Sequence, residues 1–132
     1  MSSSLALQQA IFAVLTTDAT LTTLLGGPRV HDGAPRGAAF PYVTFGQSRL
    51  IDWSTGTEAG DEHAVTLHAW SRTPGKKETL AILAAIRATL HDQPLTLSGY
   101  SLINLRLDFA EARREPDGET WHGLLRFRAV TE

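Results

Sequence analysis

The chain of 132 residues contains no cysteine. This absence excludes disulfide bonds, thiolate catalysis and cysteine-ligated metal sites from any account of its fold or function. A cysteine-free chain fits a reducing cytosol but does not by itself identify the compartment.

Long hydrophobic runs are also missing. No segment approaches the roughly eighteen consecutive apolar residues that a membrane span requires. Residues 1–17 carry no charged side chain, and Gln8-Gln9 interrupts their apolar run, which does not match a secretion signal with a basic start. We therefore expect a soluble protein that is not exported and has no membrane partner.

Positive charge is sparse and scattered along the sequence. The chain has 12 Lys and Arg against 14 Asp and Glu, for a formal net charge of −2. A protein that holds nucleic acid by its phosphates needs clustered positive charge. The nearest approach to a cluster is Arg113-Arg114 with Arg126 and Arg128, so binding to DNA phosphates is not expected.

The length and composition fit one globular domain spanning residues 1–132. Hydrophobic residues make up 42% of the chain and charged residues 20%, which is ordinary for a globular protein. A domain of this size buries roughly two-thirds of the surface that its unfolded chain exposes, which is enough for one core.

Hydrophobic periodicity predicts three helices. Ser4 is a candidate N-cap for the first, and Asp18 for a short second helix that ends at Gly26-Gly27-Pro28. A third, amphipathic helix is predicted over about residues 76–91. The apolar face of the first helix comprises Leu7, Ala10, Ile11, Val14 and Leu15, and that of the third comprises Leu80, Leu83, Ala84 and Leu90, with Ile86 on its flank.

Alternating apolar and polar residues predict the strands. They cover residues 42–51, 64–71, 95–97 and 100–115, with a brief edge strand at Val30-His31 and a final strand after Gly118. The expected fold class is therefore α+β, with a mainly antiparallel sheet packed against the N-terminal helix and the central amphipathic helix.

The last hairpin has a predicted register. A three-residue loop, Pro116-Asp117-Gly118, places Gly118 in the left-handed conformation and Glu115 opposite Glu119. A two-residue turn would mix core and solvent positions across the ladder, which disfavours it. The predicted pairs are Leu105 with Ala129, Leu107 with Phe127 and Phe109 with Leu125 on one face, and Arg106 with Arg128 and Asp108 with Arg126 on the other.

A search for chemistry in the sequence finds no catalytic, cofactor or metal site. His63 and His68 point to opposite faces of one strand, and no pair of histidines has metal-ligand spacing. Gly75-Lys76-Lys77 lacks the earlier glycine and the following Ser or Thr of a phosphate-binding loop. We expect no enzymatic activity and no cofactor.

Three segments together resemble a known family. They are the strand opening Pro41-Tyr42-Val43, the strand end LHAWSR at residues 67–72, and the helix entry Gly75-Lys76-Lys77. Their order and spacing resemble the tail completion, or tail-terminator, proteins of long-tailed bacteriophages and phage-like gene transfer particles. The resemblance covers most of the chain and is strongest over residues 30–90.

The resemblance implies a structural protein of the virion tail that is assembled in the host cytoplasm. Its subunits would form a hexameric ring on the tail tube, end tube polymerisation and offer a docking surface to the head. The implied partners are further copies of the chain, the major tail tube protein and the head–tail connector protein. DNA would pass through the lumen without specific binding, so lumen residues should be neutral or acidic.

Two alternatives stay open. One is a head–tail connector subunit of the same particle, which would also be a small ring protein. The other is a small α+β enzyme or ligand-binding domain that uses His68 or His122 as a base. The resemblance does not distinguish an infectious phage from a gene transfer agent.

The segment DWSTGTEAGDE, residues 52–62, is the expected contact site. It is longer than the connection of two to five residues that a hairpin needs, and long charged loops on rigid scaffolds often carry binding function. We expect it to be exposed, poorly ordered in the free subunit, and in contact with the tail tube or the lumen. Its predicted contact residues are Asp52, Trp53, Glu58, Asp61 and Glu62, with Trp53 as the apolar anchor.

Overall fold

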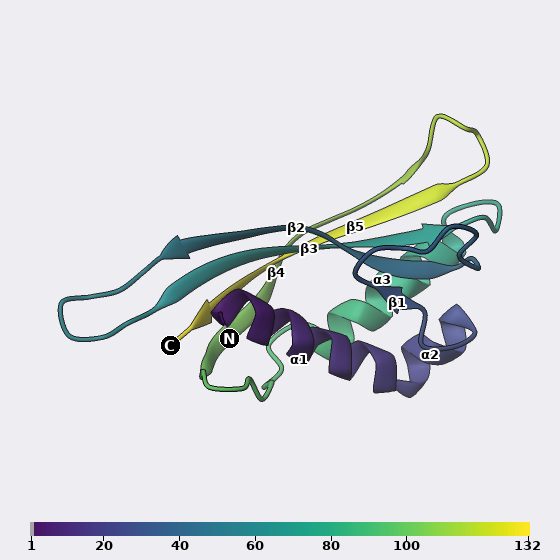
Figure 1. Ribbon diagram of the computed structural model, residues 1–132. Helices are drawn as coiled ribbons and strands as arrows, with labels where there is room; N and C mark the ends of the chain where they lie inside the picture. The colour runs from purple at the N-terminus through teal and green to yellow at the C-terminus, as the bar shows by residue number, and fades with distance from the viewer. Residues whose placement is uncertain (1) are drawn as a thin grey trace.

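Helices cover one face of a mixed five-stranded sheet in the computed structural model, which describes residues 2–132 (Figure 1). The strand order is β1-β2-β3-β5-β4, with β1 parallel to β2 and the other neighbours antiparallel. The α+β prediction is therefore confirmed. The elements are α1 (Ser3–Thr17), α2 (Ala19–Leu25), β1 (Val30–His31), β2 (Tyr42–Asp52), β3 (Asp61–Ser71), α3 (Lys77–Leu90), β4 (Leu102–Arg114) and β5 (Trp121–Thr131).

The caps of the first two helices follow from short polar side chains. The N-cap of α1 is Ser2, whose extended backbone lets its Oγ accept a hydrogen bond from the backbone N–H of Leu5 at 3.1 Å. The prediction of Ser4 is wrong, because that residue already lies inside the helix. Asp18 caps α2 as predicted, accepting from the N–H of Leu21 at 2.9 Å, and Gly26 ends that helix with a left-handed φ of 81°.

The buried face of α3 differs from the predicted stripe. Leu80 is 51% exposed, whereas Ile82 and Ile86 are fully buried with Leu83 and Leu90. At 3.6 residues per turn, Ile82, Leu83, Ile86 and Leu90 share one face of the helix, and Leu80 and Ala84 lie outside it and are exposed. The buried face packs on the sheet at Gly123 of β5, where the missing side chain lets Leu83 and Thr79 approach the backbone closely.

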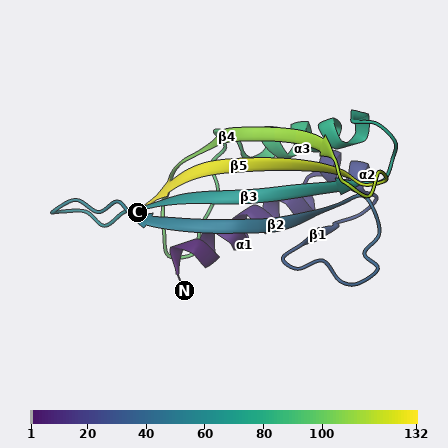
Figure 2. The same cartoon turned by 90° about the horizontal axis from the view of Figure 1, so that it is seen from above.

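The sheet has one buried face and one uncovered face. Val65, Leu67 and Ala69 of β3 point toward the helices, as the alternation predicted, and His68 and Trp70 point away. Figure 2 looks onto the uncovered face, with the helices behind the strands. We call this surface the open face.

The register of the β4–β5 hairpin is partly as predicted. Leu105 pairs with Ala129, and Leu107 with Phe127. A bulge then shifts the ladder, so Phe109 pairs with Arg126 on the open face and not with Leu125. The predicted register is therefore wrong beyond Leu107.

The turn of this hairpin is also longer than predicted. The N–H of Glu115 donates to the carbonyl of Thr120 at 2.8 Å, which leaves residues 116–119 as a four-residue loop. Asp117 holds the loop by accepting two backbone N–H groups and the Thr120 hydroxyl, and these bonds lower its pKa to about 2. Gly118 takes the predicted left-handed conformation, with a φ of 74°.

The segment before β4 is not the predicted strand. Residues 95–97 form no extended ladder, and Leu97 makes an isolated bridge with Tyr100 across the turn at Ser98-Gly99. Two pairing residues are too few to propagate a strand, so this segment serves as the connection from α3 to β4.

The close approach at Gly123 gives a test of the fold. A Cβ added there would lie 2.7 Å from Leu83 Cδ2 and 2.9 Å from Thr79 Cγ2. We expect Gly123→Ala to lower the free energy of unfolding by about 1–3 kcal/mol through overpacking, as measured by urea denaturation. Gly33→Ala is the control, because a Cβ added at that position would meet nothing within 4 Å. Equal stability of the two variants would contradict this packing.

Candidate assembly surfaces

The predicted acidic loop forms the tip of a projecting hairpin. Strands β2 and β3 extend to Asp52 and Asp61, which pair with each other, so the connecting loop is residues 53–60 and not 52–62. The distal strands and the loop, residues 50–62, reach well past the helices (Figure 1). We call this segment the hairpin arm.

The projection follows from the dimensions of helices and strands. Eleven residues of β3 span about 36 Å at roughly 3.3 Å per residue. The fifteen residues of α1 span only about 22 Å at 1.5 Å per residue. The sheet is therefore longer than the helical layer that covers it.

The arm is held together by its own hydrogen bonds. The N–H of Trp53 donates to the carbonyl of Gly60, and that of Thr55 to the carbonyl of Glu58, both at 2.8 Å. Asp52 accepts from the N–H and hydroxyl of Ser54, and these bonds lower the pKa of its carboxyl. Asp52 thus stays ionised at neutral pH.

The structure separates the five predicted contact residues into two groups. Asp61 accepts a hydrogen bond from the Ser3 hydroxyl at the start of α1, at 2.6 Å, and Glu62 pairs with Arg128 at 2.9 Å. Two of the four carboxylates in residues 52–62 therefore bond to their own domain. Asp52, Trp53 and Glu58 remain exposed, with Trp53 at 53%.

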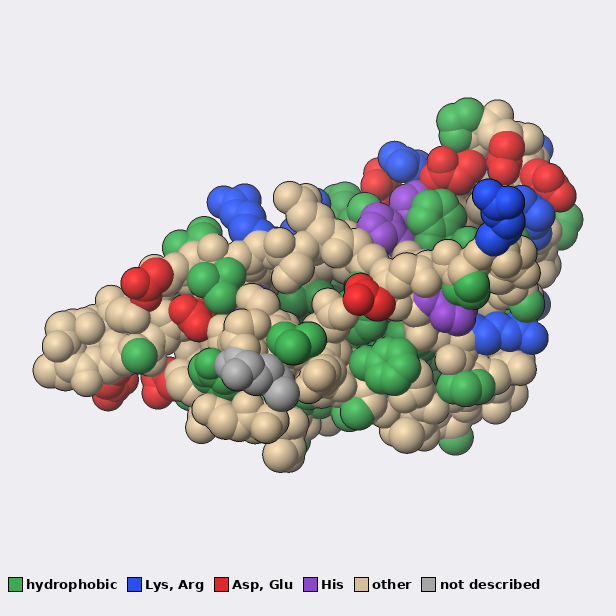
Figure 3. Space-filling model, viewed as in Figure 1, with side chains coloured by type: hydrophobic (Ala, Val, Ile, Leu, Met, Phe, Trp, Pro, Cys, Tyr) green, Lys and Arg blue, Asp and Glu red, His purple; other side chains and the backbone are tan. Residues whose placement is uncertain are grey.

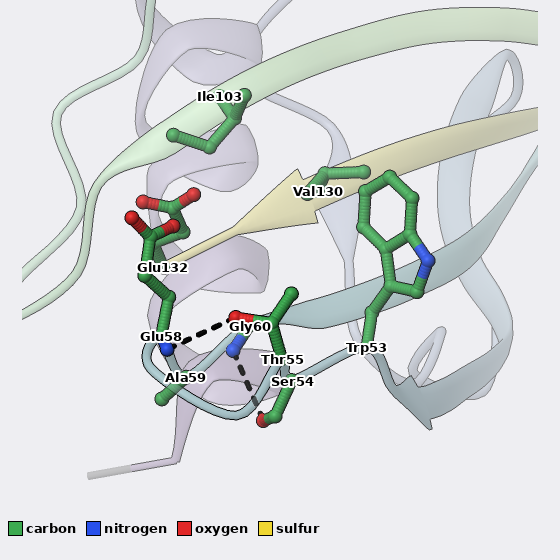
Figure 4. Close-up of a pocket in the computed structure, with 9 residues that line it drawn as sticks. All are labelled: Trp53, Ser54, Thr55, Glu58, Ala59, Gly60, Ile103, Val130 and Glu132. Atoms are coloured by element: carbon green, nitrogen blue, oxygen red, sulfur yellow. Dashed lines mark hydrogen bonds between the residues drawn. The ribbon is translucent and has the colours of Figure 1, made fainter.

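An apolar hollow lies at the root of the arm. Trp53, Ile103 and Val130 line it, with Glu58 and Glu132 at its rim (Figure 4). The Arg128 guanidinium lies 5.4 Å from the centre of the Trp53 ring. Ile103 is half exposed because it sits at an irregularity in the β4–β5 ladder.

Arginines that are scattered in the sequence come together on the open face. Arg49, Ala64, Arg128 and Arg106 form one row across four strands, and Arg126 lies in the next row beside Thr66. We call the surface formed by Arg49, Arg106, Arg126 and Arg128 the arginine face. The predicted hairpin register placed Arg106, Arg126 and Arg128 on one face, but it could not add Arg49, whose position depends on the strand order.

The charged side chains of the arm have the opposite sign. No Lys or Arg occurs from Leu50 to His63. In Figure 3 the projecting end shows acidic, hydrophobic and uncharged side chains, while Lys and Arg side chains lie elsewhere on the surface. One chain thus carries an acidic projection and a basic surface side by side.

A hydrogen-bonded series of side chains occupies the other end of the open face. His122 Nδ1 lies 2.7 Å from Glu115 Oε1, and His122 Nε2 lies 2.6 Å from His68 Nδ1. With both imidazoles neutral, His68 donates to His122 and His122 donates to the Glu115 carboxylate. The Trp70 ring stacks on His122 at 4.0 Å, nearly parallel.

The two histidines that the sequence offers as candidate bases therefore contact each other. Burial, then the neighbouring His122, then Arg113 lower the pKa of His68. Gly46 makes the arrangement possible, because a Cβ there would overlap the His68 ring. No local motif signals this series of side chains, since its members come from β3, β5 and the turn that follows β4.

His63 lies on the opposite face, as predicted, where it is buried and bonds to the Thr131 hydroxyl at 2.9 Å. Burial lowers its pKa, while Asp61 opposes that shift. Within residues 2–132, no group of three or more His, Asp or Glu side chains is arranged to hold a metal ion. The same residues contain no helix with the length and hydropathy to cross a membrane.

Comparison with known proteins identifies the class to which this architecture belongs. Residues 9–132 match the family described as tail completion protein gp17. The chain belongs to this family and is a structural component of the tail of a phage or phage-like particle. This confirms the resemblance drawn from residues 41–43, 67–72 and 75–77.

Individual relatives agree with the family. The chain is 25% identical over 125 residues to tail completion protein gp17 of Bacillus phage SPP1, covering 95% of this chain and 91% of that protein. It is similar to a chain in the virion of a native gene transfer agent particle, with 31% identity, a TM-score of 0.90, and coverage of 100% and 99%. The structure of bacteriophage SPP1 gp17 shares the fold, with a TM-score of 0.66, 22% identity, and coverage of 96% and 89%.

The lowered histidine pKa values predict how stability depends on pH. The folded state binds fewer protons than the unfolded state when a histidine pKa is depressed, so stability falls as the pH drops below about 6.5. We expect a lower free energy of unfolding at about pH 5.5 than at about pH 7.5 by urea denaturation, with His68→Gln reducing the difference. An unchanged pH dependence in His68→Gln would exclude a contribution from His68.

Proposed function

We propose that this protein closes into a hexameric ring on the tail tube, ends tube polymerisation and presents the surface on which the head–tail connector protein docks. The ring is assembled in the host cytoplasm, and DNA passes through its lumen without specific binding. Membership of the tail completion family supports this proposal. The function is structural and requires neither a catalytic site nor a cofactor.

The hairpin arm is the single observation that carries the proposal. A cyclic ring needs two different surfaces on each subunit, because every copy contacts its neighbours head to tail. The arm extends past the helices and bears exposed Leu50, Ile51 and Trp53, which add nothing to the core of their own subunit. An apolar, hydrogen-bonded projection of this kind is suited to insertion into an assembly.

We assign the contact role to the arm residues Asp52, Trp53, Glu58, Asp61 and Glu62. Trp53 is the apolar anchor, since large exposed aromatic side chains dominate the energetics of interfaces. Asp61 and Glu62 set the direction of the arm through Ser3 and Arg128, while Asp52 and Glu58 meet the partner. The arm contacts the tail tube or lines the channel of the ring.

Ring formation predicts the oligomeric state. We expect native mass spectrometry to detect hexamers of the purified protein, or electron micrographs of particles to show a ring at the head-proximal end of the tail. Trp53→Ala should weaken the assembly, because about half of this side chain is exposed in the single subunit. Monomers alone in solution and no ring on tails would refute the proposal.

A shortened arm tests the contact role directly. Replacing residues 54–59 with Asn-Gly joins the strands by a tight turn and removes Glu58 while leaving the core intact. We expect this variant to fold, with an unfolding temperature close to that of the parent, but to leave tails of irregular length and heads unjoined. Thr57→Ala, which keeps the length and charge of the loop, is the control. Normal tails and joined heads with the shortened arm would contradict the contact assigned to Glu58 and the loop tip.

A further inference from the structure

The arginine face carries more positive charge than its own ion pairs neutralise, although the carboxylates of Glu62 and Asp108 border a hollow together with Arg49 and Arg126. Arg128 pairs with Glu62 at 2.9 Å, and Arg106 lies 3.5 Å from Asp92. Arg49 and Arg126 have no carboxylate within ion-pair distance among the described residues, although both are exposed. The Arg126 guanidinium instead lies 5.9 Å from the centre of the Phe109 ring.

A shallow hollow separates these two arginines. Ala64 and Thr66 of β3 line it together with Gln47, Arg49 and Arg126. Short side chains on β3 between longer neighbours leave room for a side chain from outside, with a guanidinium on either side. Arginine at such a position favours a carboxylate, which accepts hydrogen bonds from its planar fork.

The hairpin arm has two carboxylates with the matching property. Asp52 bonds only to Ser54 within its own loop, and the Glu58 side chain has no hydrogen bond or ion pair within residues 2–132. Both are exposed, and no basic residue accompanies them in the arm. Two unpaired carboxylates on one surface therefore correspond to two unpaired arginines on another.

Pairing within one subunit is disfavoured by the ladder. Asp52 pairs with Asp61, whose carboxylate bonds to Ser3 of α1, so Asp52 lies on the helix side of the sheet. Arg49 is three residues away and therefore points to the open face. The carboxylate and the guanidinium are on opposite sides of the same strand.

We propose that the hairpin arm of one subunit lies across the arginine face of the next copy of this chain, with Asp52 and Glu58 against Arg49 and Arg126. This inference rests on the proposed ring and takes the channel-lining position for the arm, naming the neighbouring subunit as its binding partner. The contact is head to tail, which is the kind of contact that a closed ring uses.

The channel gives an independent reason to cover the arginine face. Four arginines exposed to the lumen would hold DNA phosphates and oppose the passage of DNA. An acidic arm laid over them neutralises the surface. The charge of the arm thus makes the ring interface and keeps the arginines from the DNA.

A charge-swap experiment tests the pairing. The face variant is Arg49→Glu with Arg126→Glu, and the arm variant is Asp52→Lys with Glu58→Lys. The control is Arg36→Glu with Arg87→Glu, which makes the same charge change at exposed positions in the loop after β1 and on α3. Each protein is purified for native mass spectrometry and also expressed in cells that lack the natural gene, where head-joined particles with normal tails are counted.

Each variant alone should lose joined particles by about tenfold or more, because like charges then meet at every interface. The two variants expressed together should recover assembly, since an alternating ring brings the acidic arm of one onto the basic face of the other, and the reverse. A chain carrying all four substitutions should recover for the same reason. The control should match the parent.

Several results would overturn the inference. One is a face variant that assembles like the parent, and another is failure of both the mixture and the four-substitution chain. Rings that form normally from the face variant but lose affinity for duplex DNA would assign the arginines to DNA. Rings that form normally from the arm variant but do not attach to tubes would assign the arm to the tail tube. Normal particles without any copy of the gene would instead refute the proposed function itself.

Discussion

The contact of α3 with the sheet at Gly123 is the constraint on which the rest of the structure depends. Helix α3 packs against α1, α2, β3, β4 and β5, so it is the centre of the single buried layer. A side chain at position 123 would push Leu83 and Thr79 away from β5. The missing side chain therefore lets the apolar face of α3 pack closely on the sheet.

A layer of helices on only one side of the sheet has two consequences. The open face is left to polar, charged and aromatic side chains, which bring Glu115, His122 and His68 into one hydrogen-bonded series and four arginines into neighbouring rows. The strands also extend beyond the helices, because the rise per residue is about twice as large in a strand as in a helix. The arm therefore projects because its two strands are long, and the loop only connects them at the tip.

Features that depend on local periodicity were predictable from the sequence. The two N-terminal helices, the alternation of β3 and the Asp18 cap follow from side chains close together in the chain. The buried face of α3 is also present in the local spacing, because Ile82, Ile86 and Leu90 recur every four residues, and the predicted stripe was wrong in taking Leu80 in place of Ile82. The local spacing does not show the close approach of this face to Gly123, which is far away in the sequence.

The candidate site likewise contains residues that the local sequence predicts and contacts that depend on distant parts of the chain. Asp52, Trp53 and Glu58 were found as members of a long polar connection, and they do lie exposed on the arm. The partners of Asp61 and Glu62 come from α1 and β5, which no spacing in the loop could reveal. The bulge beyond Leu107 moved Phe109 to the open face, and the arginine face requires the register of four strands at once.

The arrangement of charge bears on how subunits of this kind associate. A contact of arm with arm, or of arginine face with arginine face, is repulsive, because like-charge juxtaposition at an interface is costly. The proposed contact of arm with face is attractive, and it can be made reciprocally in a two-fold dimer or in one direction around a ring. Only the ring gives every subunit the same direction. Such a ring has two unlike rims, and a cap that binds the tube on one side and the head on the other requires that difference.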